Sequence, residues 1–304
     1  MNRSYLIFML GSALITAGVH YLLANHMKKR GLLAALTFVF GIVLGTVCAR
    51  LMYCLICYQD VLMDGLQETL FSDSMECVSY YGGMMGVILG AALAAKCTGN
   101  KPMAALNAYA PAGALMAAMA RFAEYFLYQS DGLCVGRIIE EEAFQFFPLA
   151  VGKAYSEDYT EWSLAVFMLC GVAYLIVFLV SLNRFKEKKF IRTLFYLCLP
   201  QIILESLRNY NRLTWTQFVR VEQLMCMVCL EVILVLYGVW AGKETKNRFL
   251  PAIVGLLCAG LFVGIEFALD KTNLPHAFTY AVMIAGLCVL GWMEHIGFKN
   301  TVRS

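Results

Sequence analysis

Long apolar runs separated by short polar segments fill most of this 304-residue chain. A run of about 20 apolar residues is long enough to cross the hydrocarbon core of a bilayer as a helix. Nine such runs lie at residues 5–25, 32–58, 80–95, 103–128, 162–182, 193–207, 221–240, 249–269 and 276–297. The pattern therefore predicts an all-α fold, a polytopic integral membrane bundle of about nine transmembrane helices.

The loops between these runs alternate in charge, which predicts an orientation. Basic residues gather at 28–30, 96–101, 184–192, 243–248 and 299–303, whereas acidic residues fill 60–76 and 140–161. Lysine and arginine are enriched in loops that stay in the cytoplasm. With nine spans, this alternation places the N-terminus outside and the C-terminus in the cytoplasm.

Composition narrows the classes of protein that fit. The chain is 61% hydrophobic and 15% charged, with a mean hydropathy of +0.68, whereas a soluble domain carries about 25% charged residues. No basic stripe with a recognition motif is present, which argues against nucleic-acid binding.

Twelve cysteines raise the question of metal or disulfide chemistry. The C-x-x-C pairs Cys54/Cys57 and Cys226/Cys229 lie in apolar runs, where cysteine behaves as a small hydrophobe, so we predict neither a metal nor a cofactor. Cys77 and Cys134 fall in loops expected on the same side, and both a disulfide and a reduced pair fit the sequence.

The stretch 104–132 is apolar enough to span a membrane, yet it carries Arg121 and Glu124. Residues three apart share one face of a helix. A charge at the bilayer centre costs about 2.5–3.5 kcal/mol on insertion scales, so it is rarely kept without a reason. The small residues at 113–120 let neighbouring helices approach closely. We predict a central helix whose polar site faces the interior of the bundle.

Other polar residues are expected near this site. Arg50 and Glu205 fall toward the outer ends of their spans, at the depth of Arg121. Together these groups fit either a phosphate site with an acid or base, or a buried structural ion-pair network. Glycines 82 and 83 open the span at 80–95, where a backbone can approach a ligand. The arginines between 208 and 220 fit either an interfacial belt or a lipid-headgroup site.

The order of these motifs resembles one known family over roughly residues 3–240. The stretches that carry the resemblance are 49–53 (ARLMY), 79–86 (SYYGGMMG), 110–112 (APA), 120–124 (ARFAE) continuing to Gly132, 203–208 (ILESLR) and 221–223 (VEQ). The chain is similar to the prolipoprotein diacylglyceryl transferases of the bacterial cytoplasmic membrane. This resemblance implies transfer of a diacylglyceryl group from phosphatidylglycerol to the lipobox cysteine of a prolipoprotein, with formation of a thioether and release of glycerol phosphate.

The resemblance also implies site residues and partners. Its catalytic positions fall on Arg121, Glu124, Glu205 and Tyr81. Its substrate-binding positions fall on Arg50, Tyr53, Tyr5, Gly82, Gly83, Gln129, Gly132, Gln201, Arg208 and Gln223. The partners implied are phosphatidylglycerol or another anionic phospholipid and the signal peptide of a prolipoprotein, with no cofactor.

Four positions depart from the family pattern. Tyr81 stands where the family has histidine, Glu124 for asparagine, Gln129 for glutamate and Gln201 for arginine. Glu124 can replace the lost base, and Arg208, Arg212 or Arg220 the lost cation. These departures leave a non-catalytic lipid- or lipoprotein-binding protein as the alternative function. A transporter fits less well, because the sequence has neither paired broken helices nor repeats.

The expected domain organisation follows from the same resemblance. Residues 1–242 would form the transferase-like membrane domain, with an outer cap segment at 129–161. Residues 243–304 would add a pair of transmembrane helices.

Overall fold

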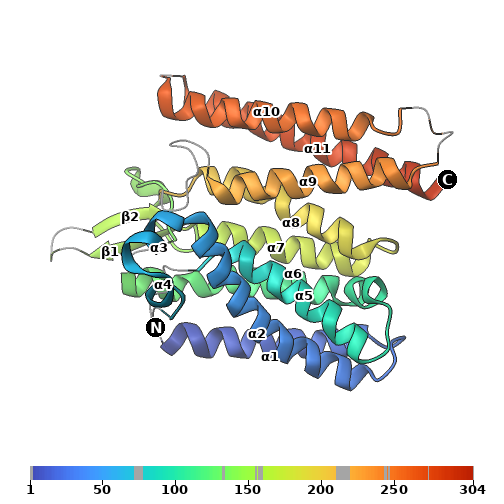
Figure 1. The fold of residues 1–304 in the computed structure, drawn as a ribbon. Coiled ribbons are helices and arrows are strands. Elements are labelled where there is room, and N and C mark those ends of the chain that lie inside the picture. The colour runs from blue at the N-terminus through green and yellow to red at the C-terminus, as the bar shows by residue number, and fades with distance from the viewer. Residues whose placement is uncertain are drawn as a thin grey trace. The chain divides into compact units, whose positions relative to one another are not determined.

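The computed structural model describes residues 3–71, 78–131, 134–154, 156, 160–209, 220–242, 245, 247–272 and 274–303. Within these residues the fold is helical apart from one β-hairpin (Figure 1). The long helices are α1 (Arg3–Leu23), α2 (Arg30–Ile56), α5 (Tyr80–Cys97), α6 (Pro102–Asp131), α7 (Val166–Asn183), α8 (Lys189–Ser206), α9 (Val221–Trp240), α10 (Leu250–Lys271) and α11 (His276–Arg303). The shorter elements are α3 (Tyr58–Asp64), α4 (Leu66–Phe71), the 3-10 helix η1 (Glu142–Phe144), β1 (Ala150–Ala154) and β2 (Thr160–Leu164).

Eight of the described helices are long and apolar enough to cross a membrane, namely α1, α2, α5, α6, α7, α9, α10 and α11. Many large apolar side chains on them are exposed, such as Leu14 (61%), Leu256 (66%) and Trp292 (63%). An apolar surface of this kind is what a lipid-facing helix presents. The expected polytopic helical membrane bundle is therefore confirmed.

The remaining long helix, α8, was expected as a span at 193–207. It begins earlier, at Lys189, and carries three charged residues, Lys189, Arg192 and Glu205. The expected span at 162–182 also begins elsewhere, because residues 160–164 form β2, which pairs antiparallel with β1. The hairpin, α3 and α4 were not predicted, since an apolar-run analysis finds only spanning helices.

The chain divides into two compact units. Unit 1 contains residues 1–194 and 208–210, and unit 2 contains residues 195–207 and 211–304. Most of α8 and all of α9 belong with α10 and α11 in unit 2, and the expected domain boundary at residue 242 stays a prediction.

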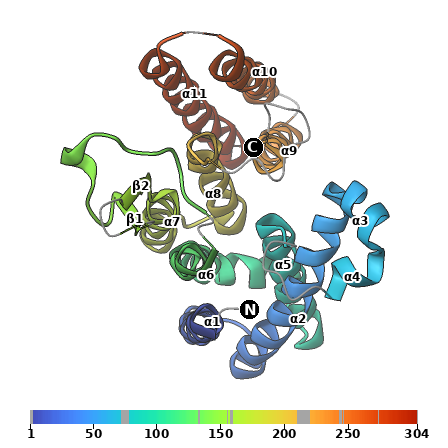
Figure 2. The ribbon, with the colours of Figure 1, turned by 90° about the vertical axis from the view of Figure 1, so that its left-hand side faces the viewer.

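In unit 1, α6 packs against α1, α5 and α7, while α2 packs against α5 (Figure 2). The α2–α5 interface depends on glycines spaced four apart on α5. A Cβ on Gly82 would lie 2.5 Å from the carbonyl oxygen of Cys48, and one on Gly90 would lie 2.8 Å from the carbonyl carbon of Phe40. A Cβ on Gly86 would overlap the backbone of Leu44. Small residues at this spacing let two membrane helices approach to backbone contact.

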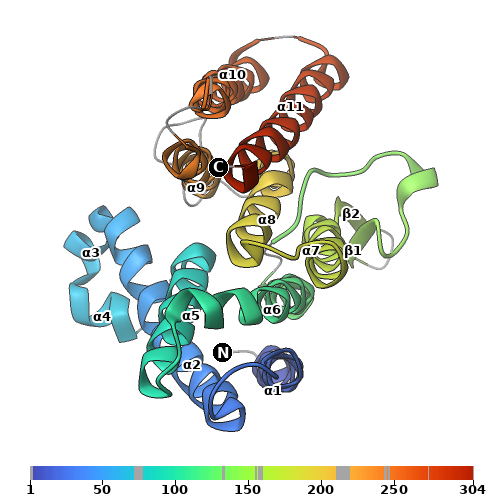
Figure 3. The same cartoon turned by 90° about the vertical axis from the view of Figure 1, so that its right-hand side faces the viewer.

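Two of the basic loops of unit 1 are hydrogen-bonded to each other. Asn100, after α5, accepts a hydrogen bond from Lys28 N at 2.9 Å and donates one to Lys28 O at 3.0 Å. The loop between α1 and α2 is therefore joined to the loop between α5 and α6. The β-hairpin lies beside α7 (Figures 2 and 3) and follows the opposite end of α6.

In unit 2, α9, α10 and α11 each contact the other two (Figure 3). Glu294 of α11 is fully buried and fastens this helix to its neighbours. Its carboxylate accepts hydrogen bonds from the hydroxyls of Tyr196 at 3.0 Å and Tyr237 at 3.3 Å. A buried carboxylate needs such donors, because burial without them is costly.

Candidate active site

Three charged side chains form a buried cluster at the end of α6. The carboxylate of Glu124 accepts a hydrogen bond from Arg121 Nη1 at 2.5 Å and another from Arg208 Nη2 at 2.9 Å. The side chains of Arg121, Glu124 and Arg208 are only 1%, 10% and 10% exposed. The two carboxylate oxygens serve different guanidinium groups, so Glu124 holds both arginines in place. We call these three residues the arginine cluster.

Backbone contacts from residues 135 and 136 position Arg208. Gly136 forms an isolated antiparallel bridge with Arg208, and Asn209 N donates to Val135 O at 3.1 Å. The same segment pairs with the strand end at Leu164, which accepts from Gly136 N at 2.7 Å. The backbone of Arg208, which follows α8, is thus fixed in a position from which its side chain reaches Glu124. Residues 135 and 136 therefore hold the backbone beside Arg208, and the expected cap over the site stays a prediction.

Tyr80 completes the surroundings of Arg121. The guanidinium carbon lies 3.7 Å from the centre of the Tyr80 ring, a cation–π contact. The Tyr80 hydroxyl donates to Ala117 O of α6 at 3.3 Å. Ser79 caps α5 by accepting from Gly82 N at 3.3 Å, and Ser79 N donates to Ala49 O at 3.1 Å. The start of α5 therefore joins α2 to the arginine cluster.

Tyr80 was missed in the sequence analysis, which selected its neighbour Tyr81. Tyr81 is buried, and its ring centre lies 5.6 Å from that of Tyr80 in an edge-on arrangement. The sequence held one signal for Tyr80, because it lies in the same glycine-bearing turn, residues 79–86, that was selected for the site. Adjacent residues of a helix point in different directions, and only the fold decides which one meets Arg121.

Tyr5 of α1 lies within electrostatic range of the cluster, because Glu124 and Arg121 both act on its phenol. Packing of Phe8 on Phe126, with ring centres 5.6 Å apart, holds α1 against α6 at this level. On α7, Tyr174 is 1% exposed and acts electrostatically on Arg121. The structure thus brings together four of the residues expected in the site: Tyr5, Arg121, Glu124 and Arg208.

The cluster carries two guanidinium groups and one carboxylate, which gives a net positive charge. Guanidinium groups match the oxygen geometry of phosphate, and a preorganised cation in a water-poor site stabilises negative charge that develops during a reaction. Glu124 has both oxygens committed to arginines, which favours orientation of the arginines over proton transfer.

Unit 2 holds the other expected acid. Glu205 is 5% exposed, and its Oε2 accepts a hydrogen bond from Gln201 Nε2 at 2.8 Å, one helical turn away on α8. Gln223 of α9 is fully buried and donates to Ile202 O at 3.0 Å and to Glu266 Oε1 at 2.7 Å. Both N–H groups of this amide are committed within the protein, which favours an orienting role for Gln223.

The remaining predicted residues lie in several settings. On α2, Arg50 is partly exposed and Tyr53 is buried, and their part in the site stays a prediction. Close packing of α5 on α2 explains the glycine at position 82 without any ligand. A Cβ on Gly83 would make only ordinary contacts, at 3.7 Å from Ala49 Cβ and 3.8 Å from Gly45 O.

Some of the sequence predictions fall on undescribed residues. Gly132, Arg212 and Cys77 lie outside the described residues, as does the side chain of Gln129 within α6. The question of a Cys77–Cys134 disulfide is therefore not tested. The cysteines of the two C-x-x-C pairs are free thiols. Among the described residues, no three His, Cys, Asp or Glu side chains gather so that they could hold a metal ion.

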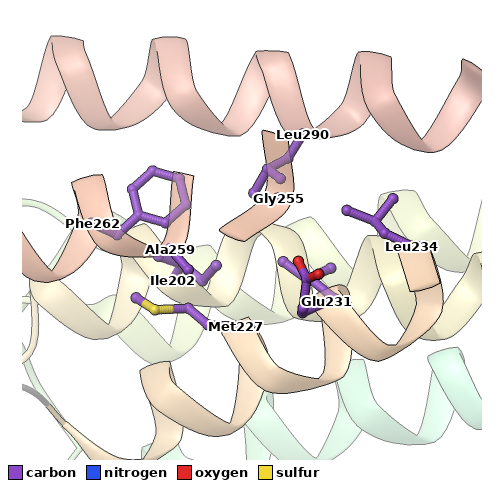
Figure 4. A pocket seen from close by; sticks show the side chains of 9 residues that line it. Ile202, Met227, Glu231, Leu234, Gly255, Ala259, Phe262 and Leu290 are labelled. Atoms are coloured by element: carbon purple, nitrogen blue, oxygen red, sulfur yellow. The ribbon is translucent and has the colours of Figure 1, made fainter. Parts of the chain in front are cut away.

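Two hollows differ greatly in size. In unit 2, a cavity of about 10 Å³ lies between α9 and α10, with Glu231, Gly255 and Phe262 among its walls (Figure 4). It has room for about one water molecule. In unit 1, a hollow of about 480 Å³ is lined by Tyr125, Phe147, Trp162 and residues of β1. Only the second lies in the range of about 300–1,000 Å³ typical of small-molecule sites.

The sequence model of a family described as prolipoprotein diacylglyceryl transferase matches residues 3–240. The matched region includes the whole arginine cluster, Tyr80, Glu205 and Gln223, and it ends before α10. No curated protein matches the chain.

Proposed function

This chain belongs to the prolipoprotein diacylglyceryl transferase family, whose reaction moves the diacylglyceryl group of phosphatidylglycerol onto a prolipoprotein cysteine, and on that premise we propose a role for the arginine cluster. Arg121 and Arg208 bind the phosphate of phosphatidylglycerol, and Glu124 orients them. The observation that carries this proposal is the single carboxylate held between two buried guanidinium groups.

The bond changes explain why cations are needed. The cysteine sulfur attacks the glyceryl carbon that is bonded to the phosphate oxygen, and a carbon–sulfur bond forms as that carbon–oxygen bond breaks. Glycerol phosphate leaves with the electron pair of the broken bond, so negative charge grows on the phosphate. Fixed guanidinium groups stabilise this charge more in the transition state than in the ground state, which lowers the barrier.

The thiol must also lose its proton, and we assign Glu205 as the base that accepts it. Its carboxylate is buried and fixed by Gln201, and it lies within the region that the family model matches. A positioned carboxylate can act as a general base for a thiol in the transition state. Tyr81 stands where the family has histidine, and we assign its hydroxyl to hydrogen bonding with a substrate.

The setting of the reaction follows from the charge pattern. We place the protein in the bacterial cytoplasmic membrane, with the basic loops in the cytoplasm and the arginine cluster toward the outer face. Lys28 and Asn100 mark the basic end of unit 1, and the hairpin follows the other end of α6. Phosphatidylglycerol would enter from the outer leaflet, and the acceptor would be the signal peptide of a prolipoprotein.

A reconstituted transfer assay tests this proposal. Purified protein is incubated with phosphatidylglycerol and a lipobox peptide, and the thioether-linked product is measured by mass spectrometry. Arg121→Ala should lose about 100-fold or more in rate, as removal of one preorganised donor does in other enzymes. Arg184→Ala is the matched control, because Arg184 is exposed at the end of α7 and carries the same charge.

Two results would contradict the proposal. Equal rates in wild type and Arg121→Ala would remove the arginine cluster from the reaction. Phosphatidylglycerol binding without product, with every lipobox peptide tested, would favour the non-catalytic lipid-binding alternative.

A further inference from the structure

Gln223 connects three segments of unit 2 through one side chain. Its Oε1 accepts a hydrogen bond from Arg220 N at 3.3 Å, just before α9 begins. Its Nε2 donates to Ile202 O of α8 at 3.0 Å and to Glu266 Oε1 of α10 at 2.7 Å. The orientation of this amide therefore depends on an acceptor supplied by α10.

Glu266 comes from a part of the chain that the family match does not reach. The match ends at residue 240, whereas α10 spans Leu250–Lys271. Glu266 is 7% exposed on a helix that is otherwise apolar enough to cross a membrane. Burial of a carboxyl group in that setting costs free energy unless the group is hydrogen-bonded. The hydrogen bond from Gln223 supplies that partner, so the two residues depend on each other.

The link from Glu266 reaches the turn of α8 that carries the expected base. Ile202 O, the second acceptor of Gln223, lies between Gln201 and Glu205 in sequence, and those two residues are hydrogen-bonded to each other at 2.8 Å. A change at Glu266 would release one N–H of Gln223. The amide could then rotate away from Ile202, and the turn with Glu205 would lose a fixed neighbour.

We propose that Glu266 is a positioning residue for the transfer reaction, which makes the C-terminal helix pair part of the functional unit. Glu266 acts through Gln223, which fixes the turn of α8 that holds Gln201 and Glu205. This inference rests on the proposed role of Glu205, but its geometry is independent of the arginine cluster. It adds to the family's site a residue from outside the matched region.

Three variants at two positions of α10 test the inference. Glu266→Ala removes the acceptor and should lower kcat for lipobox-peptide lipidation at least tenfold, while KM for phosphatidylglycerol changes less than twofold. Glu266→Gln keeps an acceptor oxygen and should retain at least half of wild-type kcat. Asp270→Asn is the matched control, because this carboxylate lies four residues further along α10 and is 44% exposed, paired with Lys271. It should behave as wild type.

A double-mutant cycle separates this inference from the proposed function. Glu266→Ala and Gln223→Ala should each lower the melting temperature in detergent, and the double variant should lose clearly less than the two losses together. This readout needs no transfer activity, so it stands even if the wild-type protein makes no product. Additive losses, or Glu266→Ala with wild-type kcat, would overturn the inference. So would a Glu266→Gln variant as impaired as Glu266→Ala, because loss of charge alone would then explain the effect.

Discussion

Glu124 and Arg208 are 84 residues apart in the chain, yet their side chains meet at 2.9 Å. Glu124 belongs to α6, whereas Arg208 follows α8 and is held by the backbone of Val135 and Gly136. The other oxygen of Glu124 serves Arg121. One carboxylate therefore sets the spacing of two guanidinium groups, and the following predictions depend on that arrangement.

Loss of the Glu124 carboxylate should affect stability more than loss of Arg208. Glu124→Gln leaves Arg121 and Arg208 facing a neutral group, and removal of one partner of a buried ion pair costs about 3–5 kcal/mol. In Arg208→Ala, Glu124 keeps Arg121. Denaturation in detergent should therefore show a larger loss for Glu124→Gln. The double variant should be destabilised by less than the two losses together, with a coupling of about 0.5–3 kcal/mol. Additive losses would show that the three side chains do not act as one cluster.

The aromatic face of Tyr80 should matter more than its hydroxyl. Tyr80→Phe keeps the ring over Arg121 and should retain kcat/KM for phosphatidylglycerol within about twofold, since the loss of one weak hydrogen bond is small. Tyr80→Leu removes a cation–π contact worth about 0.5–2 kcal/mol, which corresponds to about a 2- to 30-fold loss. The comparison is made from initial rates at several lipid concentrations. A Tyr80→Phe variant as impaired as Tyr80→Leu would assign the effect to the hydroxyl.

Adjacent glycines on α5 should respond in opposite ways to alanine. Gly82→Ala places a methyl group 2.5 Å from the Cys48 carbonyl oxygen, so α2 and α5 must separate. Overpacking of this kind costs about 1–3 kcal/mol. Gly83→Ala makes only ordinary van der Waals contacts, at 3.7 Å from Ala49 Cβ and 3.8 Å from Gly45 O, and should gain about 0.5–1 kcal/mol from a less flexible unfolded chain. Thermal unfolding in detergent measures both. Equal effects would contradict the assignment of Gly82 to helix packing.

Tyr81 can be tested by two substitutions of similar size. Tyr81→Phe removes the hydroxyl from a buried ring and should lower kcat at least about tenfold if that group binds substrate in the transition state. Tyr81→His restores the residue type of the family pattern and should keep product formation above the level of Tyr81→Phe. Both variants are compared in the lipobox-peptide assay. Wild-type kcat in Tyr81→Phe would exclude the hydroxyl from the reaction.

The spanning helices were predictable because each needs a long apolar run. The expected bounds of α9, 221–240, agree with the observed Val221–Trp240. The prediction failed where apolar residues serve another structure. Trp162 and Leu164 belong to β2, whose pairing with β1 involves residues that hydropathy alone does not connect. Likewise, α8 begins at Lys189 rather than at residue 193, because its first turn contains the charged residues Lys189 and Arg192, which an apolar-run analysis leaves out.

The site was predictable by residue type and less so by partner. A buried arginine with a carboxylate three residues away indicated a pair on α6, and the structure confirms that pair. The sequence did not single out Arg208 as the second arginine of the cluster, because its place there depends on the bridge with Gly136. Nor could it place Tyr80 over Arg121 or Glu266 against Gln223, since both contacts depend on how separate helices pack.

The central claim is that the fixed guanidinium of Arg121 carries the transfer from phosphatidylglycerol, and one substitution tests it most directly. Arg121→Lys keeps the positive charge but loses the planar fork that bonds Glu124 and faces the Tyr80 ring. The measurement is the initial rate of thioether formation on a lipobox peptide, with folded protein verified by its melting temperature. We expect a rate at least about tenfold below wild type, because lysine does not reproduce the guanidinium geometry. A wild-type rate in folded Arg121→Lys protein would contradict it.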